Sequence, residues 1–206
     1  MRSKGLLGLA LAATIGVACN SNRDNTTADN PNATVGTGGE VRDDDSSRAE
    51  GVPRSLENWV QDIVRHNTAE IELGKIAAEH AANAEVKKYG QMMVNDHTMA
   101  GSELKQTIAG KIQVTEEMDE KHRDLAERLR GLHGAEFDRE FMNAMVDGHQ
   151  EVKDMLESRA NEKPNNEPVE NNVNQWAAKT LPKVEQHLQQ AEQLRDKLQD
   201  RRNTTN

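Results

Sequence analysis

The chain has 206 residues, enough for one domain of ordinary size with extensions at its ends. Its residues are 30% charged and only 2% aromatic, which favours helices over a sheet sandwich built from aromatic and β-branched side chains. The formal net charge of −9 repels nucleic acid, and no basic patch offsets it, so we expect no nucleic-acid partner.

Residues 1–18 have the pattern of a secretory signal peptide. Arg2 and Lys4 precede an apolar run, residues 6–18, that is too short to span a bilayer as a helix. The run ends at Cys19, the single cysteine of the chain. Residues 15–19 (IGVAC) resemble a bacterial lipobox, which implies cleavage before Cys19 and lipidation of that residue. An ordinary signal followed by an incidental cysteine is the alternative.

A lipid on Cys19 would make a membrane the protein's partner. Asn20, rather than Asp, follows the cysteine, and in lipoproteins of diderm bacteria this usually accompanies delivery to the outer membrane. We therefore expect a cell-envelope protein that is anchored to the outer membrane and faces the periplasm. Residues 19–54 are mostly Asn, Asp, Thr, Gly and Ser without apolar periodicity, which predicts a disordered tether.

Five segments carry apolar residues at spacings of three and four, the pattern of amphipathic helices. They span residues 55–82, 84–108, 116–132, 135–160 and 168–200. Ser55 and Asn83 are candidate N-caps, and Gly131 and Gly134 allow a reversal after the third segment. We assign residues 55–200 to a helical bundle and residues 201–206 to a disordered tail.

The lengths of the connections constrain the topology. Tight turns make the first two helices antiparallel, and the last two likewise. The short third helix can carry the chain back along the bundle, so that the second and fourth helices run parallel. The sequence therefore predicts an all-α, ferritin-like four-helix bundle with a short additional crossover helix. An up-down bundle of five helices is the alternative.

Polar side chains interrupt the apolar stripes of all four long helices. His97, His149 and His187 lie on or beside three of these stripes, and Glu70 lies on the fourth. Two of the histidines end similar motifs, MVNDH (93–97) and MVDGH (145–149). By contrast, we expect His66 to be exposed, and His80 and His133 to fall on exposed or terminal positions. A buried polar group must find a partner, since leaving it unpaired costs several kcal/mol.

Imidazole and carboxylate groups that meet between helices are the usual components of metal sites in bundles. We predict a site for a copper, iron or zinc ion with Glu70, His97, His149 and His187 as ligands. Asp96 and Asp138 are predicted as further ligands or as residues that orient the histidines. A hydrogen-bond network that only fixes helix register is the alternative. A di-iron site is not expected, because the Glu-x-x-His motif is absent: valine occupies the position three residues before each histidine.

Four pieces of the bundle are notable: AEIELGKIA (69–77), EVKKYGQMMVNDHT (85–98), GAEFDREFMNAMVDGHQ (134–150) and TLPKVEQHL (180–188). Together they resemble domain-of-unknown-function family 4142, ferritin-like proteins that are often labelled predicted outer-membrane proteins. The resemblance implies a ferritin-like fold and an envelope location. It carries over, as pattern positions, Glu70, Asp96, His97, Asp138, His149 and His187. The family has no established reaction.

Two classes of function follow from these patterns. The first is an envelope lipoprotein that sequesters or buffers a transition metal. The second is a non-enzymatic structural or stress-related lipoprotein whose inward polar groups serve register alone. The chain has no nucleotide-binding loop, nucleophile elbow or zinc-protease motif, so we do not expect a common hydrolase or nucleotide-dependent enzyme.

Overall fold

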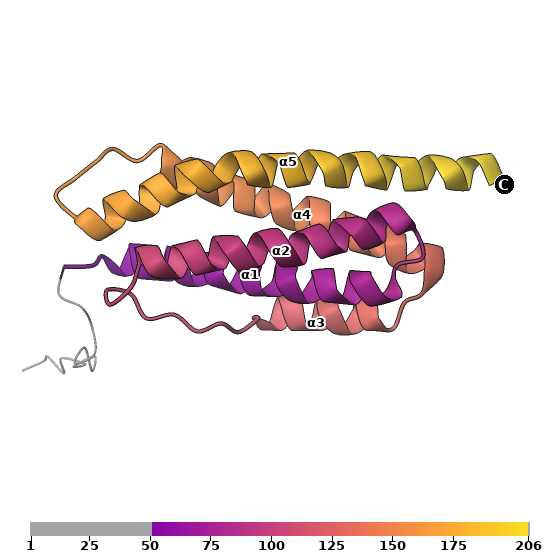
Figure 1. Ribbon diagram of the computed structural model, residues 1–206, viewed down its shortest axis with the longest axis horizontal. Helices are drawn as coiled ribbons and strands as arrows, with labels where there is room; N and C mark the ends of the chain where they lie inside the picture. Colours follow the sequence, from indigo (N-terminus) through magenta and orange to yellow (C-terminus); the bar gives the residue numbers. More distant parts are fainter. Residues whose placement is uncertain (1–50, 206) are drawn as a thin grey trace, which may run out of the picture. The chain divides into compact units, whose positions relative to one another are not determined.

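The computed structural model describes residues 51–205, and side chains for residues 51–200. The helices in this part of the chain are α1 (Arg54–His80), α2 (Ala84–Thr107), α3 (Glu120–Arg130), α4 (Gly134–Ala160) and α5 (Pro168–Thr205). Residues 51–205 contain no strand, and an isolated backbone bridge joins Ala81 to Gly134. The chain is therefore all-α over this range, as predicted (Figure 1). Cys19, the predicted signal and nearly all of the predicted tether lie outside it.

Four long helices form two antiparallel hairpins, α1 with α2 and α4 with α5 (Figure 1). The chain between the hairpins returns to the end of the bundle where α1 stops, and on the way α3 packs against α1. Arg130 in α3 pairs with Glu72 in α1 at 2.6 Å and helps to hold this crossover in place. Because of the crossover, α2 and α4 run parallel, so the ferritin-like prediction is confirmed over the five-helix up-down alternative.

Local hydrogen bonds decide where several helices begin. The side chain of Asn83 accepts a hydrogen bond from the backbone N–H of Glu85 at 2.8 Å, which confirms the predicted N-cap of α2. The predicted cap at Ser55 is wrong, since α1 already begins at Arg54 after Pro53, without a side-chain cap.

Two further helices differ in length from the segments expected. The crossover helix α3 is shorter than the segment 116–132, because Asp119 caps it by accepting a hydrogen bond from the His122 N–H at 2.9 Å. At the other end of the chain, α5 continues through Pro182 to Thr205, beyond the expected end at residue 200. None of the helices in residues 51–205 combines the length and apolar character needed to cross a membrane.

A pair of glycines brings the backbones of α1 and α2 into contact. A Cβ atom added to Gly74 would lie 2.6 Å from the carbonyl oxygen of Gly90. A Cβ atom added to Gly90 would lie 2.7 Å from Cβ of Ala77. Both distances are too short for real carbon contacts, so only glycine allows this approach of the two helices. The close approach fixes the register of the α1–α2 hairpin.

The apolar core is divided into two clusters. The first contains residues such as Leu73, Met93, Met145 and Leu188, and the second contains Val64, Leu104, Val152 and Val184. Along each long helix, a buried polar residue of the predicted site falls between the two sets: Glu70, His97, His149 and His187. In α1, His66 is also buried between them. The fold thus gathers a polar layer across the middle of the bundle, and the candidate site lies in this layer.

Candidate metal site

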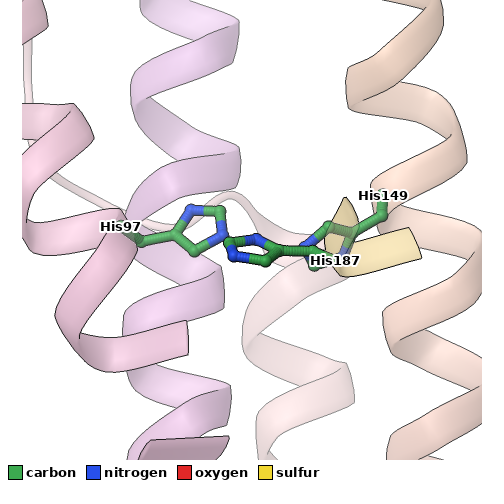
Figure 2. Close-up of side chains that lie close together, drawn as sticks. All are labelled: His97, His149 and His187. Carbon is green, nitrogen blue, oxygen red and sulfur yellow. The ribbon is translucent and has the colours of Figure 1, made fainter. Parts of the chain in front are cut away.

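Three imidazole rings converge from separate helices: His97 from α2, His149 from α4 and His187 from α5 (Figure 2). Their ring centroids lie 5.7 Å apart for His97 and His149, 5.7 Å for His97 and His187, and 5.5 Å for His149 and His187. One nitrogen of each ring lies within 4.8 Å of a nitrogen of the other two. All three side chains are buried, with exposed fractions of 8%, 1% and 2% in chain order.

The hydrogen bonds of each ring identify which nitrogen carries the proton. Nδ1 of His149 lies 2.8 Å from the carbonyl oxygen of Met145, which can only accept, so Nδ1 donates. Nε2 of His187 lies 2.9 Å from Oδ2 of Asp96 and donates to that carboxylate. Nδ1 of His97 lies 3.2 Å from Oδ1 of Asn67 and donates to the amide oxygen.

The other nitrogen of each ring therefore keeps its lone pair. These atoms are Nε2 of His97, Nε2 of His149 and Nδ1 of His187, and each is buried without a hydrogen-bond partner in the described part of the chain. Leaving a buried acceptor unpaired costs about 1–3 kcal/mol, which a network evolved only for register would avoid. A ligand nitrogen that is free on one side, with the other ring N–H held by an acceptor, is the usual arrangement in metal-binding histidines.

The site keeps its histidines neutral. Burial, together with neighbouring His149 and His187, holds the pKa of His97 well below its usual value. Burial and the adjacent His187 lower the pKa of His149 to about 3, against the hydrogen bond to Met145. Burial also lowers the pKa of His187, although its bond to Asp96 opposes this shift. Neutral imidazole is the form that coordinates a metal, so the ligands are in the binding form at neutral pH.

Glu70 lies beside the histidines, on the far side of the His149 ring from its free nitrogen. Its Oε1 is 3.5 Å from Nδ1 of His149, and its Oε2 is buried without a partner among the described residues. Burial raises the pKa of Glu70 to about 8, so near pH 7 a mostly neutral carboxyl faces a neutral imidazole. The structure thus places Glu70 next to the predicted ligands, while the three-residue cluster itself consists of histidines.

The space beside the rings of His97 and His187, which His149 does not border, suits a small occupant. A cavity of about 40 Å³ is bordered by Asn67, Glu70, Asp96, His97 and His187. This volume exceeds the roughly 10–15 Å³ that one water-sized occupant requires. Imidazole nitrogens bind zinc at about 2.0–2.1 Å in tetrahedral geometry, so two ligand nitrogens of one ion lie roughly 3.4 Å apart. A pair as wide as 4.8 Å would therefore have to close by about 1.4 Å when an ion binds, and the donor set of three neutral imidazoles fits an ion of this kind.

Asp138 is not brought to the cluster. Its Oδ1 and Oδ2 accept hydrogen bonds from the backbone N–H groups of Ala82 and Asn83, at 3.1 and 2.9 Å. These bonds tie the N-terminal part of α4 to the connection between α1 and α2. Asp138 is thus a structural residue at one end of the bundle, and its inward position on the helical stripe reflects this contact rather than a place beside the histidines.

The burial of His66 differs from the sequence prediction, which expected an exposed side chain. It is buried, with an exposed fraction of 8%, because the crossover covers it: the ring of His122 in α3 lies 4.8 Å away, edge to face. The prediction failed because it considered only the four long helices. The structure places the other two histidines as expected, with His133 exposed and His80 partly buried at the end of α1.

Asn67 was not singled out by its sequence, although it orients His97. It lies three residues before Glu70 and therefore on the same face of α1. That spacing was the available signal. The carbonyl group of Met145 left no comparable signal, since every residue carries one.

Comparison with known proteins identifies one family. The family model described as a domain of unknown function (DUF4142) matches residues 43–194. No curated protein and no solved structure matches the chain. The matched range includes Asp96 and the three histidines of the cluster.

Proposed function

Since the chain belongs to the family described as a domain of unknown function (DUF4142), we propose a function from the site alone: the bundle binds one transition-metal ion through His97, His149 and His187. Copper, iron and zinc all suit imidazole ligands, and they are the candidate ions. Glu70 and Asp96 supply nearby carboxyl groups that can compensate the charge of the ion.

One observation carries this proposal. Three neutral imidazoles from three helices converge, with one nitrogen of each ring within 4.8 Å of the others. An acceptor outside the cluster holds each ring by its N–H group, and the unprotonated nitrogen of each ring is buried without a partner among the described residues. Three unpaired acceptors buried in one cluster are unfavourable unless a cation or a donor satisfies them. A metal ion satisfies all three nitrogens at once.

We further propose that the protein acts in the cell envelope as a lipoprotein. The support comes from the amino-terminal sequence: a short positive segment, an apolar run and the single cysteine at its end. A lipid at Cys19 would hold the metal-binding bundle near a membrane through the segment 19–54. In this position the protein would sequester or buffer metal ions rather than catalyse a reaction.

Equilibrium dialysis against Cu²⁺, Zn²⁺ and Fe²⁺, followed by elemental analysis, tests the metal site. We expect one ion per chain for at least one of these metals, and loss of most of it in His149→Ala. His133→Ala is the matched control, because His133 is exposed and outside the cluster, and it should bind as the wild type does. Equal binding by wild type and His149→Ala would contradict the site, and absence of binding would favour the register-setting network.

A further inference from the structure

A surface groove lies behind the polar layer, between α1, α3 and α4. It has a volume of about 560 Å³, and its lining includes more acidic than basic side chains. Lys121 pairs with Glu151 at 3.0 Å, and Arg128 lies 3.9 Å from Glu140. Two further lining carboxylates, Asp124 and Asp147, have no ion-pair partner among the described side chains. The groove therefore has a negative charge that attracts cations.

Glu70 separates this groove from the histidine cavity. Among the described residues, it is the single side chain that borders both spaces. It is buried, with an exposed fraction of 4%, and its Oε2 has no hydrogen-bond partner in the described chain. An unpaired carboxyl oxygen at the boundary of two spaces is available to a cation that arrives from the groove side.

Gly148 provides the room that this carboxyl group occupies. A Cβ atom added to Gly148 would lie 3.0 Å from Oε1 of Glu70, closer than nearly all real Cβ contacts. Because Gly148 lines the groove and directly precedes His149, its missing side chain leaves the Glu70 carboxyl group directly against α4. A larger residue would push Glu70 away from this boundary.

The opposite side of the cavity is less favourable to a cation. Lys183 borders the cavity there, and its Nζ lies 3.7 Å from Oδ2 of Asp96. Its side chain is 54% exposed, so the ammonium group lies at the surface of this side. An approaching metal ion would meet a positive charge at this mouth, in contrast to the net negative groove.

We propose that Glu70 is a transfer ligand, which receives a divalent transition-metal ion from the acidic groove and passes it to His97, His149 and His187. The groove between α1, α3 and α4 is then the access route, and Asp124 and Asp147 collect ions at its surface. This role rests on the proposed function. It differs from a role as a permanent ligand, because a transfer residue accelerates uptake and release together and changes the equilibrium affinity little.

Stopped-flow measurement of Co²⁺ uptake and release by the full chain separates these roles. Glu70→Gln keeps the size of the side chain and replaces a carboxyl group, which can lose its proton to bind a cation, with an amide that cannot. We expect it to lower both rate constants by about tenfold or more while the Kd changes less than about threefold. Gly148→Ala should change the rates of uptake and release in the same direction, because the added methyl group displaces the Glu70 carboxyl group. Alanine itself is well tolerated in a helix. Lys183→Gln, at the opposite mouth, is the control and should leave uptake unchanged.

The alternatives give different results. Unchanged uptake with faster release in Glu70→Gln would make Glu70 a ligand or positioning residue and overturn the transfer role. A larger effect of Lys183→Gln on uptake would move the access route to the other mouth. If circular dichroism shows that Glu70→Gln does not fold, Gly148→Ala decides. If the wild type binds Co²⁺ and every variant takes it up and releases it at the wild-type rates, the transfer role alone fails. If the wild type does not bind Co²⁺, the proposed function fails as well.

Discussion

The carboxylate of Asp96 on α2 lies 2.9 Å from Nε2 of His187 on α5, and this contact fixes which nitrogen of the ring carries the proton. With Nε2 protonated, Nδ1 keeps its lone pair and remains without a partner in the described chain. A single hydrogen bond between two helices thus sets both the tautomer and the orientation of a candidate ligand.

Loss of this contact should weaken metal binding. Asp96→Ala removes the acceptor, and loss of such an outer partner typically lowers metal affinity about 10–100-fold. Asp96→Asn keeps a neutral acceptor and should restore part of the affinity. Competition titration with a chelating dye measures the Kd of each variant. Asp154→Asn, an exposed change on the outer face of α4, is the control, and equal affinities for Asp96→Ala and this control would contradict the orienting role.

Most of the fold could be predicted because it depends on local patterns. Apolar spacings of three and four identified all four long helices, and the tight turn capped by Asn83 fixed the antiparallel α1–α2 hairpin. The ends of α1 and α3 were less well predicted. Apolar spacing does not show where a helix begins: α1 begins after Pro53 without a side-chain cap, and Asp119 caps α3.

The site was predicted less completely than the fold. Inward polar residues on separate helices identified His97, His149 and His187, because a helical stripe fixes which face a residue occupies. Position along the bundle is harder to predict. Asp138 shares the stripe of His149 but lies eleven residues earlier, next to the α1–α2 connection. The burial of His66 depends on α3, whose packing the periodicity of α1 does not reveal.

The metal-free protein should be most stable near neutral pH, for two opposing reasons. The folded-state pKa values of His97, His149 and His187 lie below those of the unfolded chain. Their contribution to the free energy of unfolding is therefore fully present above about pH 6.5 and is lost as the pH falls. The pKa of Glu70 is raised to about 8, so its contribution to the free energy of unfolding is fully present below about pH 4.5 and is lost as the pH rises toward 8. Each group changes the free energy of unfolding by up to about 1.4 kcal/mol per pH unit within its window.

Urea unfolding of metal-free wild type and Glu70→Gln between pH 5 and pH 9 checks this prediction. Glu70→Gln should remove most of the decline in stability between pH 6.5 and 8 and keep the decline on the acid side. A wild-type stability that rises steadily from pH 6.5 to 8 would show that Glu70 ionises normally in the folded state.

Asp138 should matter for stability and not for metal binding. Asp138→Ala leaves the backbone N–H groups of Ala82 and Asn83 without their acceptor, which should lower the free energy of unfolding by about 1–3 kcal/mol. Urea unfolding measures the loss, and metal titration of the folded variant should give the wild-type Kd. A weakened Kd in a fully folded Asp138→Ala variant would place Asp138 in the metal site after all.

Membrane attachment should depend on Cys19. Stable anchoring requires two or more lipid chains, and only a cysteine at the end of the apolar run can carry the thioether lipid of a lipoprotein. Cys19→Ser should therefore move the protein from the membrane fraction to the soluble fraction on cell fractionation in high salt. If the variant still sediments with membranes, the lipoprotein proposal is wrong.

Thermal unfolding with and without metal tests the central claim most directly. A ligand that binds only the folded state raises the Tm, so wild-type protein at pH 7 should gain stability with copper, zinc or iron. The gain should shrink toward pH 5, because metal must then compete with protons for the imidazoles. His97→Ala and His149→Ala should each lose most of the gain, whereas the exposed control His133→Ala should keep it. A Tm that does not respond to any of these metals in wild type and all three variants would contradict the metal site.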